Sequence, residues 1–282
     1  EVAMAGMAGL DPVTINTITH ENAMRLFRFD PFEHRSKADS NVGGLKAGDG
    51  CLRRAGMGAG SLRVVLFDLD GTLVHTAPDI TVALNSALAE HQLPTFEQAQ
   101  VRGWIGRGPQ VLVQRALAVA GRDDPALAAR VLHQYLQAYE RQLATWSTPF
   151  PGAADCLRQL ASSGYRLAVV SNALQRFAER ILQRSGLAHY LQLVVGGNRL
   201  REGKPHPAPL LYACDQLGAL PAEALMVGDS ISDVEAARAA GCRLVCVTHG
   251  YTGERPLGPD DCELIESLAL LPAWIEARQR PR

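Results

Sequence analysis

The sequence predicts an α/β protein in which a doubly wound parallel sheet carries an inserted helical cap. Two observations lead to this prediction. From residue 62 onward, short apolar runs alternate with helical patterns, and four of those patterns stop at a glycine. One interval, 76–148, contains helical patterns only. Repeated alternation of strand and helix requires right-handed crossovers, and these build a doubly wound sheet.

Five segments are predicted to be strands. Each is short and apolar throughout, which is typical of parallel strands that helices cover on both faces. The segments are 62–67, 165–171, 191–195, 224–228 and 243–248.

Four helices are predicted between these strands, over 152–163, 174–185, 207–217 and 231–240. A glycine follows each of them, where a left-handed C-cap favours a residue without a Cβ. These glycines are Gly164, Gly186, Gly218 and Gly241.

The interval 76–148 has two apolar helical faces. The first comprises Ile80, Ala83, Leu84, Ala87 and Leu88, and the second comprises Leu127, Val131, Leu132, Tyr135, Leu136 and Tyr139. The segment TFEQ, 95–98, has the sequence of a capping box that starts a helix between them. An insertion of this length does not fit inside a sheet crossover. We therefore expect a separate bundle over the carboxyl edge of the sheet, where open α/β sheets bind ligands.

Three parts of the chain follow from this pattern. Residues 1–60 have glycine- and alanine-rich clusters and little periodicity, apart from one candidate helix over 18–32, so we expect a poorly ordered or fusion-derived extension. Residues 61–75 and 149–282 should form the core, and 76–148 the helical cap.

Composition limits the classes of partner. The formal net charge of -1 gives no electrostatic reason to expect a nucleic acid or an anionic membrane. The six cysteines have no zinc or redox spacing. No apolar run is long enough to span a membrane, and no secretory signal is recognisable, so a soluble, cytoplasmic protein is expected.

The stretch LFDLDGTLV, 66–74, places two carboxylates at the end of the first strand. Asp68 should enter the crevice at the carboxyl edge of the sheet, and the turn that Gly71 permits should return Asp70 to the same crevice. One carboxylate could then attack a substrate while the other handles protons.

Further polar residues follow the later strands. Ser171 and Asn172 follow the second strand, Lys204 follows the third, and the acidic pair of Asp229 and Asp233 follows the fourth. This set suits phosphoryl transfer, because a divalent cation and a lysine offset the charge of a phosphate that a carboxylate approaches. Mg²⁺ is the expected cation, since it prefers oxygen ligands.

The motifs DLDGT, SNA, KPHPAP and GDSISD, in this order and spacing, resemble the four motifs of the haloacid dehalogenase superfamily of Mg²⁺-dependent phosphohydrolases. The resemblance covers about residues 62–276 and implies a Rossmann-like core with a helical cap. Within it, TAPDI, WIGRGPQVLVQRAL and YTGERP resemble the phosphoglycolate phosphatase branch.

The resemblance implies roles for the motif residues. Asp68 would be the nucleophile that becomes an aspartyl phosphate. Asp70 would protonate the leaving alkoxide and then activate water. Ser171 and Lys204 would hold the phosphoryl oxygens.

The same resemblance implies a metal site and substrate contacts. The Asp68 carboxylate, the Asp70 backbone carbonyl and Asp229 would bind Mg²⁺, with Asp233 in support. Thr72 and Asn172, which lie inside the motifs, are predicted to contact substrate.

Two residues outside the core motifs are also candidates for substrate contact. Arg107 lies between Gly106 and Gly108, and its side chain could form a bidentate contact with a substrate carboxylate or phosphate, or be a solvated loop arginine. His75 stands where the branch usually has an acid. It could contact the distal group of the substrate, or be a hinge side chain with a local hydrogen bond.

The predicted function is Mg²⁺-dependent hydrolysis of a small phosphorylated metabolite, with 2-phosphoglycolate first, by a monomer or homodimer. A cap that encloses the crevice limits the size of the substrate.

The alternatives are a β-phosphoglucomutase-like phosphomutase, a sugar-phosphate phosphatase and a non-catalytic binding protein. Dehalogenases of the superfamily lack the acid at the position of Asp70. Its phosphonatases use a cap lysine, and 76–148 contains none.

Overall fold

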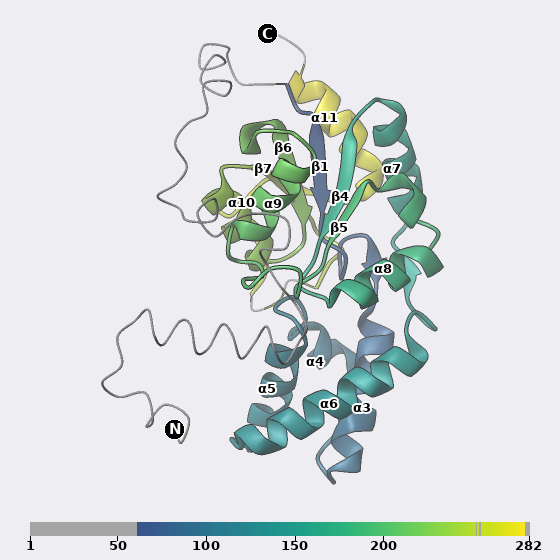
Figure 1. The fold of residues 1–282 in the computed structure, drawn as a ribbon, viewed down its shortest axis with the longest axis vertical. Coiled ribbons are helices and arrows are strands. Elements are labelled where there is room, and N and C mark those ends of the chain that lie inside the picture. Colours follow the sequence, from purple (N-terminus) through teal and green to yellow (C-terminus); the bar gives the residue numbers. More distant parts are fainter. Residues whose placement is uncertain (1–60, 252, 254, 280–282) are drawn as a thin grey trace, which may run out of the picture. The chain divides into compact units, whose positions relative to one another are not determined.

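A six-stranded sheet forms the centre of the protein (Figure 1). The structure is a computed structural model, and it describes residues 61–251, 253 and 255–279. The strand order is β5-β4-β1-β6-β7-β8, and every neighbouring pair is parallel. The strands are Val64–Phe67 (β1), Arg166–Val170 (β4), Leu193–Val195 (β5), Ala224–Gly228 (β6), Arg243–Val247 (β7) and Leu264–Ile265 (β8). All five predicted strands are confirmed, whereas β8 was not predicted.

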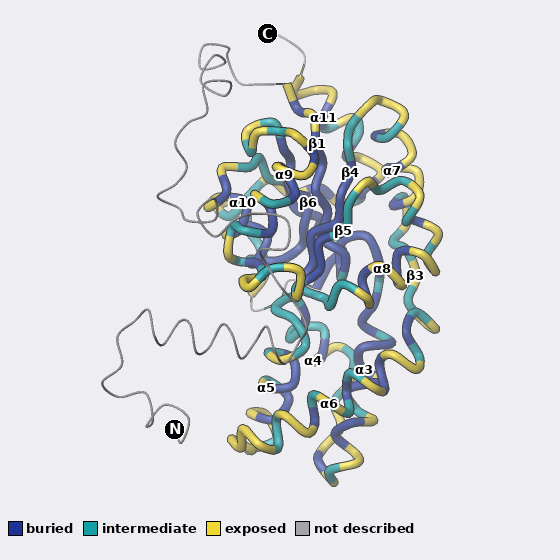
Figure 2. Tube along the Cα trace, viewed as in Figure 1, coloured by how far each residue is buried: buried dark blue, intermediate teal, exposed yellow. Residues whose placement is uncertain are grey.

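Strand β1 is buried on both of its faces. Val65 and Phe67 pack into one apolar cluster, whereas Val64 and Leu66 pack into a second cluster. Figure 2 shows β1, β4 and β6 as buried tubes at the centre of the fold. Because successive side chains of a strand point to opposite faces, a strand covered on both sides must be apolar at every position. The predicted α/β, doubly wound arrangement is therefore confirmed.

Helices connect the strands and cover the sheet. The helices and short 3₁₀ turns of this part are Ala153–Ser162 (α7), Gln175–Arg184 (α8), Ala188–Tyr190 (η4), Ala208–Gln216 (α9), Pro221–Glu223 (η5), Ile231–Ala240 (α10), Leu268–Leu270 (η6) and Leu271–Gln279 (α11). The four predicted helices correspond to α7, α8, α9 and α10. Gly241 ends α10 with φ of 73°, a left-handed conformation that favours glycine.

A group of helices is inserted after β1. The chain enters it through Val74–His75 (β2) and leaves it through Thr148–Pro149 (β3), which pair as an antiparallel ribbon. The inserted helices are Ala77–Glu90 (α3), Gln98–Arg102 (α4), Pro109–Val119 (α5) and Pro125–Gln142 (α6). They lie together in Figure 1, with α3 beside α6. The segment between the two strands of the ribbon is thus helical, within the predicted limits of 76–148.

The predicted capping box at 95–98 is wrong. Helix α4 starts at Gln98, its N-cap is Glu97, and no side chain caps it. The side-chain amide of Asn85 explains the difference. Its Oδ1 accepts from the Phe96 backbone N–H at 2.9 Å, and its Nδ2 donates to the Phe96 carbonyl at 2.8 Å. Asn85 of α3 therefore holds both backbone groups of Phe96 outside the helix, and α4 starts two residues later.

Two further predictions concern the whole chain. The extension 1–60 and the candidate helix over 18–32 lie outside the described residues. None of the helices in the described ranges combines the length and the hydrophobicity of a transmembrane span.

Candidate active site

The end of β1 is the centre of the candidate site. Asp68 follows this strand directly, and its residue is 5% exposed. Its Oδ1 lies 2.9 Å from the Lys204 ammonium and accepts from the Leu69 N–H at 2.7 Å. Strands β4 and β6 pair with β1 on either side, so Ser171 and Asp229, which follow them, lie next to Asp68.

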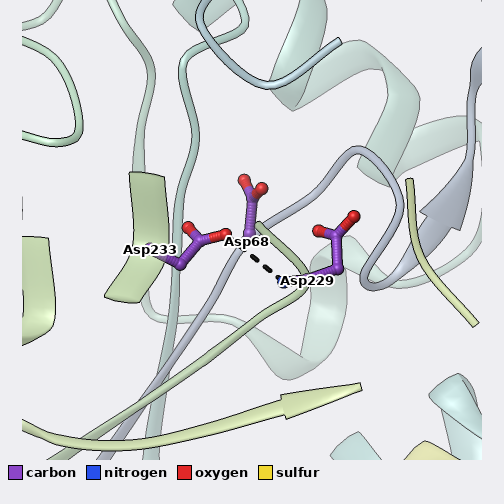
Figure 3. Close-up of side chains that lie close together, drawn as sticks. All are labelled: Asp68, Asp229 and Asp233. Carbon is purple, nitrogen blue, oxygen red and sulfur yellow. Dashed lines mark hydrogen bonds between the residues drawn. The ribbon is translucent and has the colours of Figure 1, made fainter. Parts of the chain in front are cut away.

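Three carboxylates converge at this edge of the sheet (Figure 3). One oxygen from each of Asp68, Asp229 and Asp233 lies within 4.8 Å of the others, and all three residues are buried. The backbone N–H of Asp229 donates to Asp233 Oδ2 at 3.3 Å. Clustered carboxylate oxygens are the ligands that hard divalent cations prefer, so this cluster could hold a metal ion.

Lys204 joins the cluster from the loop after β5. Its Nζ lies 2.6 Å from Asp233 Oδ1 and 2.9 Å from Asp68 Oδ1, and its side chain is 1% exposed. Burial lowers the pKa of Lys204, but the two carboxylates outweigh burial and hold this pKa above its ordinary value. The lysine is therefore a fixed positive charge beside the carboxylate that ends β1.

Negative charge exceeds positive charge in this cluster. Burial raises the pKa of Asp68 well above its ordinary value; Lys204 lowers it in part, and Asp233 and Asp229 raise it again. Burial and Asp233 also raise the pKa of Asp229 to about 7. A divalent cation held by these oxygens would offset the repulsion that disfavours the ionised carboxylates. The donor set and its unbalanced charge therefore fit the metal that the sequence predicts.

Several groups fix the carboxylate of Asp229. Thr72 Oγ1 donates to Oδ1 at 2.8 Å, and the Tyr251 N–H donates to Oδ2 at 2.7 Å. The backbone of Gly71 and of Gly250 also packs directly against the Asp229 side chain. A Cβ would lie 2.3 Å from the nearest Asp229 atom at Gly71 and 2.1 Å from it at Gly250. Thr72 is predicted to contact substrate, but its hydroxyl donates a hydrogen bond to Asp229, a candidate metal ligand.

Asp233 uses both of its oxygens within the protein. Oδ1 accepts from Lys204, and Oδ2 accepts from the Ser230 hydroxyl at 2.8 Å and the Ser230 N–H at 3.1 Å. These bonds hold the start of α10 and the ammonium of Lys204 in one arrangement. Such a geometry is what a supporting role for Asp233 requires.

Asp70 lies in the turn after Asp68. Thr76 Oγ1 donates to its Oδ1 at 2.6 Å, and the Ser171 hydroxyl lies 3.5 Å from its Oδ2. Burial raises the pKa of Asp70, and the bond from Thr76 lowers it in part. A carboxyl group with a raised pKa can hold a proton and donate it, as a general acid must. Thr76 belongs to the motif TAPDI, but no sequence pattern singles out its hydroxyl as a partner of Asp70.

A pocket opens beside these carboxylates. Its polar lining is Asp68, Asp70, Ser171 and Asn172, and the rest of its lining is mainly apolar and aromatic side chains from α3, α5, α6 and α8. The pocket has a volume of about 40 Å³. So limited a space suits a small ligand.

The remaining predicted residues lie around this pocket in different ways. Asn172 lines it and donates from Nδ2 to the Gly106 carbonyl at 2.7 Å. Gly106 and Gly108 line it too, and Arg107 lies between them. His75 is absent from the described lining; its Nδ1 lies 2.9 Å from the Tyr251 hydroxyl. Substrate contact by Arg107 and by His75 stays a prediction.

Comparison with known proteins connects this geometry to a family. The model of the haloacid dehalogenase-like hydrolases matches residues 65–247. The phosphoglycolate phosphatase of Pseudomonas putida is 39% identical over 220 residues, which cover 76% of this chain and 80% of the relative. That of Thiobacillus denitrificans is 37% identical over 218 residues, covering 77% of this chain and 94% of the relative.

A solved structure is similar in fold. The crystal structure of a protein from Haemophilus somnus 129pt, described as a predicted phosphoglycolate phosphatase, matches with a TM-score of 0.72 and 35% identity. The match covers 76% of this chain and 97% of that one. The sheet and the inserted helices thus occur together in a protein of similar sequence.

Proposed function

The chain belongs to the haloacid dehalogenase-like hydrolase family, and we propose that it is a phosphatase that hydrolyses 2-phosphoglycolate with Mg²⁺ as its cofactor. Two relatives with 39% and 37% identity over most of their length are phosphoglycolate phosphatases by name. The names support phosphatase activity. The choice of metal, the mechanism and the substrate are parts of the proposal.

One observation supports the proposal above all others. Asp68 Oδ1 lies 2.9 Å from the Lys204 ammonium, and its carboxylate is clustered with that of Asp229. A phosphate that approached Asp68 would thus meet a fixed positive charge and a pair of candidate metal ligands at the same place. These groups offset the charge that otherwise keeps a carboxylate away from a phosphate.

The proposed reaction has two steps. In the first, an Asp68 oxygen bonds to phosphorus while the ester oxygen leaves, and Asp70 gives that oxygen its proton. In the second, Asp70 takes a proton from water, whose oxygen bonds to the phosphorus of the aspartyl phosphate, and Asp68 leaves as a carboxylate. Ser171 and Lys204 hold the phosphoryl oxygens, as the family motifs imply.

The metal would be held by the Asp68 carboxylate, the Asp70 backbone carbonyl and Asp229. When bound, Mg²⁺ supplies positive charge that stabilises the transferring phosphoryl group. Asp233 supports the site by fixing the ammonium of Lys204 at 2.6 Å.

The substrate proposal follows from the pocket as well as from the relatives. The inserted helices α3, α5 and α6 line the pocket together with the carboxylates, so they are proposed to act as a cap. The narrow space between the carboxylates and these helices favours a short leaving group over a hexose. The mutase and sugar-phosphate phosphatase alternatives therefore rank behind 2-phosphoglycolate.

A panel of phosphorylated metabolites, compared by kcat/KM with and without Mg²⁺, tests the proposal. We expect 2-phosphoglycolate to rank first and Asp68→Asn to abolish its hydrolysis. A tenfold preference for hexose phosphates would overturn the substrate, and conversion of β-glucose 1-phosphate to the 6-phosphate would indicate a mutase. Activity that persists in Asp68→Asn would overturn the mechanism.

A further inference from the structure

Two tyrosines of α6 line the same pocket as Asp68 and Asp70. Tyr135 and Tyr139 are one helical turn apart, so they share a face of the helix. Their rings stack with centroids 5.6 Å apart and an interplanar angle of 12°. Tyr139 also meets Phe177 edge to face, at 5.2 Å and 89°. The ring contacts hold both side chains in place at the pocket wall.

Both tyrosines are buried as residues. Tyr135 is 4% exposed and Tyr139 is 3% exposed. Within the part of the chain that the structure describes, neither phenol oxygen takes part in a hydrogen bond. Neither phenol oxygen is among the buried, unsatisfied side-chain atoms of the described residues, so a ligand contact is inferred from their place in the pocket lining. The pocket is the place where a bound ligand could supply a hydrogen-bond partner.

The surroundings of the two phenols are mostly apolar. Ile80 of α3, Leu112 of α5 and Phe177 of α8 line the same pocket. Burial, followed by the nearby Asp70 carboxylate, raises the pKa of each phenol. Both hydroxyls therefore keep their protons at neutral pH and can donate hydrogen bonds to a ligand oxygen.

The proposed reaction does not use the hydroxyls of Tyr135 and Tyr139. Asp68, Asp70, Ser171 and Lys204 act on the phosphoryl group and on the ester oxygen. The part of the leaving group beyond that oxygen must lie against the remaining lining of the pocket, which includes the tyrosine pair. A pair of neutral donors there suits an acceptor with two oxygens, such as a carboxylate.

We propose that Tyr135 and Tyr139 determine specificity by donating hydrogen bonds to the far end of the leaving group. The substrate class is a phosphate monoester with a short leaving group that ends in a carboxylate. This inference rests on the proposed hydrolysis at Asp68. It assigns selection among substrates to α6, in addition to any contact that Arg107 makes.

The test compares two esters that differ only at the far end of the leaving group. 2-Phosphoglycolate carries a carboxylate where ethyl phosphate carries a methyl group. The variants are Tyr135→Phe, Tyr139→Phe and the double variant, which keep the stacked rings and remove only oxygen atoms. Tyr165→Phe is the matched control, because Tyr165 precedes β4 and is not part of the described pocket lining. Thermal melting of each variant checks the fold.

Each single substitution should lower kcat/KM for 2-phosphoglycolate about tenfold or more, as expected for a lost hydrogen bond to a charged group. In the same variants, kcat/KM for ethyl phosphate should change less than about threefold, because this ester has no carboxylate to accept the hydrogen bond. In Tyr165→Phe, kcat/KM should change less than about threefold for either ester. If the two esters lose activity equally, or if neither does, the tyrosines do not determine specificity. If the double variant fails to fold, the single variants decide the question.

Asp68→Asn belongs in the same assays. If Asp68→Asn is inactive and the tyrosine variants affect both esters equally, the role of the tyrosines is overturned and the proposed hydrolysis at Asp68 is not. Hydrolysis that does not need Asp68 would instead overturn the proposed function. The two failures are therefore distinguishable.

Discussion

The side-chain amide of Asn172 clamps the backbone of Lys204. Its Oδ1 accepts from the Lys204 N–H at 2.9 Å, and its Nδ2 donates to the Lys204 carbonyl at 2.8 Å. The same Nδ2 donates to the Gly106 carbonyl at 2.7 Å. One side chain thus joins the loop that carries the ammonium to the loop between α4 and α5.

Replacing Asn172 by Asp should uncouple the two loops. A carboxylate of the same shape cannot donate to either carbonyl, so we expect kcat/KM to fall by about ten- to a hundredfold. Steady-state kinetics with Mg²⁺ measures the change. Asn198→Asp is the control, because Asn198 is exposed and its Oδ1 accepts only from the Gln175 N–H among the described residues. Equal activities of the two variants would contradict the coupling.

The stabilisation by Mg²⁺ should increase with pH. Burial and Asp233 raise the pKa of Asp229 to about 7, whereas an unfolded aspartate has a pKa of about 3.9. A raised pKa in the folded state stabilises the metal-free protein below about pH 4 and loses that contribution as the pH rises through 7. Metal binding needs the ionised carboxylate, so its contribution grows over the same window.

Melting curves at several pH values between 5 and 8, with and without Mg²⁺, measure this linkage. The Mg²⁺-induced rise in Tm should be small at pH 5 and largest at pH 8. The variant Asp229→Asn should show little rise at any pH. A rise in Tm that is the same at pH 5 and pH 8 would contradict the assignment of Asp229 as a ligand.

Asp79 should contribute strongly to stability although it lies outside the pocket. Its residue is fully buried at the start of α3, and its carboxylate accepts from the N–H groups of Thr145, Trp146 and Ser147 and from the Ser147 hydroxyl. It therefore fastens the end of the helical insertion to its beginning. We expect Asp79→Asn to lower the free energy of unfolding by about 2 to 3 kcal/mol, because the NH₂ group of the asparagine would face backbone N–H donors and could not accept from them.

Urea denaturation checks the value for Asp79→Asn. Asp155→Asn serves as its control. Among the described residues, the Asp155 side chain forms only an exposed ion pair with Arg158, so this substitution should change the free energy of unfolding by less than about 1 kcal/mol. Comparable losses in the two variants would mean that the bonds of Asp79 add little.

Gly250 should be required for metal affinity. A Cβ at this position would lie 2.1 Å from the Cβ of Asp229 and 2.4 Å from its Oδ2. Gly250→Ala must displace the carboxylate, so we expect Mg²⁺ affinity to fall about tenfold or more. Gly103→Ala is the control, because Gly103 has φ of -66° and its nearest neighbour is 3.4 Å away. Calorimetric titration with Mg²⁺ compares the two, and unchanged affinity of Gly250→Ala would refute the role.

The strands of the sheet were predictable because covering both faces makes every residue of β1 and β6 apolar. The shorter strands, which are not buried in this way, show no sequence pattern that predicts them. β8 has two residues, of which Leu264 is exposed, and β2 and β3 also have two residues each, including Pro149. Segments this short show no periodicity that separates them from a loop.

The candidate site was predictable only where its residues stand in recognisable motifs. The groups that hold Asp229 and Asp70 include Tyr251 and Thr76, whose contacts depend on how distant segments meet. A single sequence does not contain that information. Tyr135 and Tyr139 show a different limit, because the helical pattern places them on the apolar face of α6. Such a pattern does not distinguish a side chain of the core from one of a pocket wall.

The central place of β1 has a consequence for synthesis on the ribosome. Its partners in the sheet, β4 and β6, leave the ribosome after it, and Asp229 follows the later of the two. A nascent chain that stops before β6 carries Asp68, the proposed nucleophile, without Asp229, the proposed metal ligand. On the proposed mechanism, we expect prematurely terminated chains to be inactive, because only a chain that has completed the crossover to β6 contains both carboxylates.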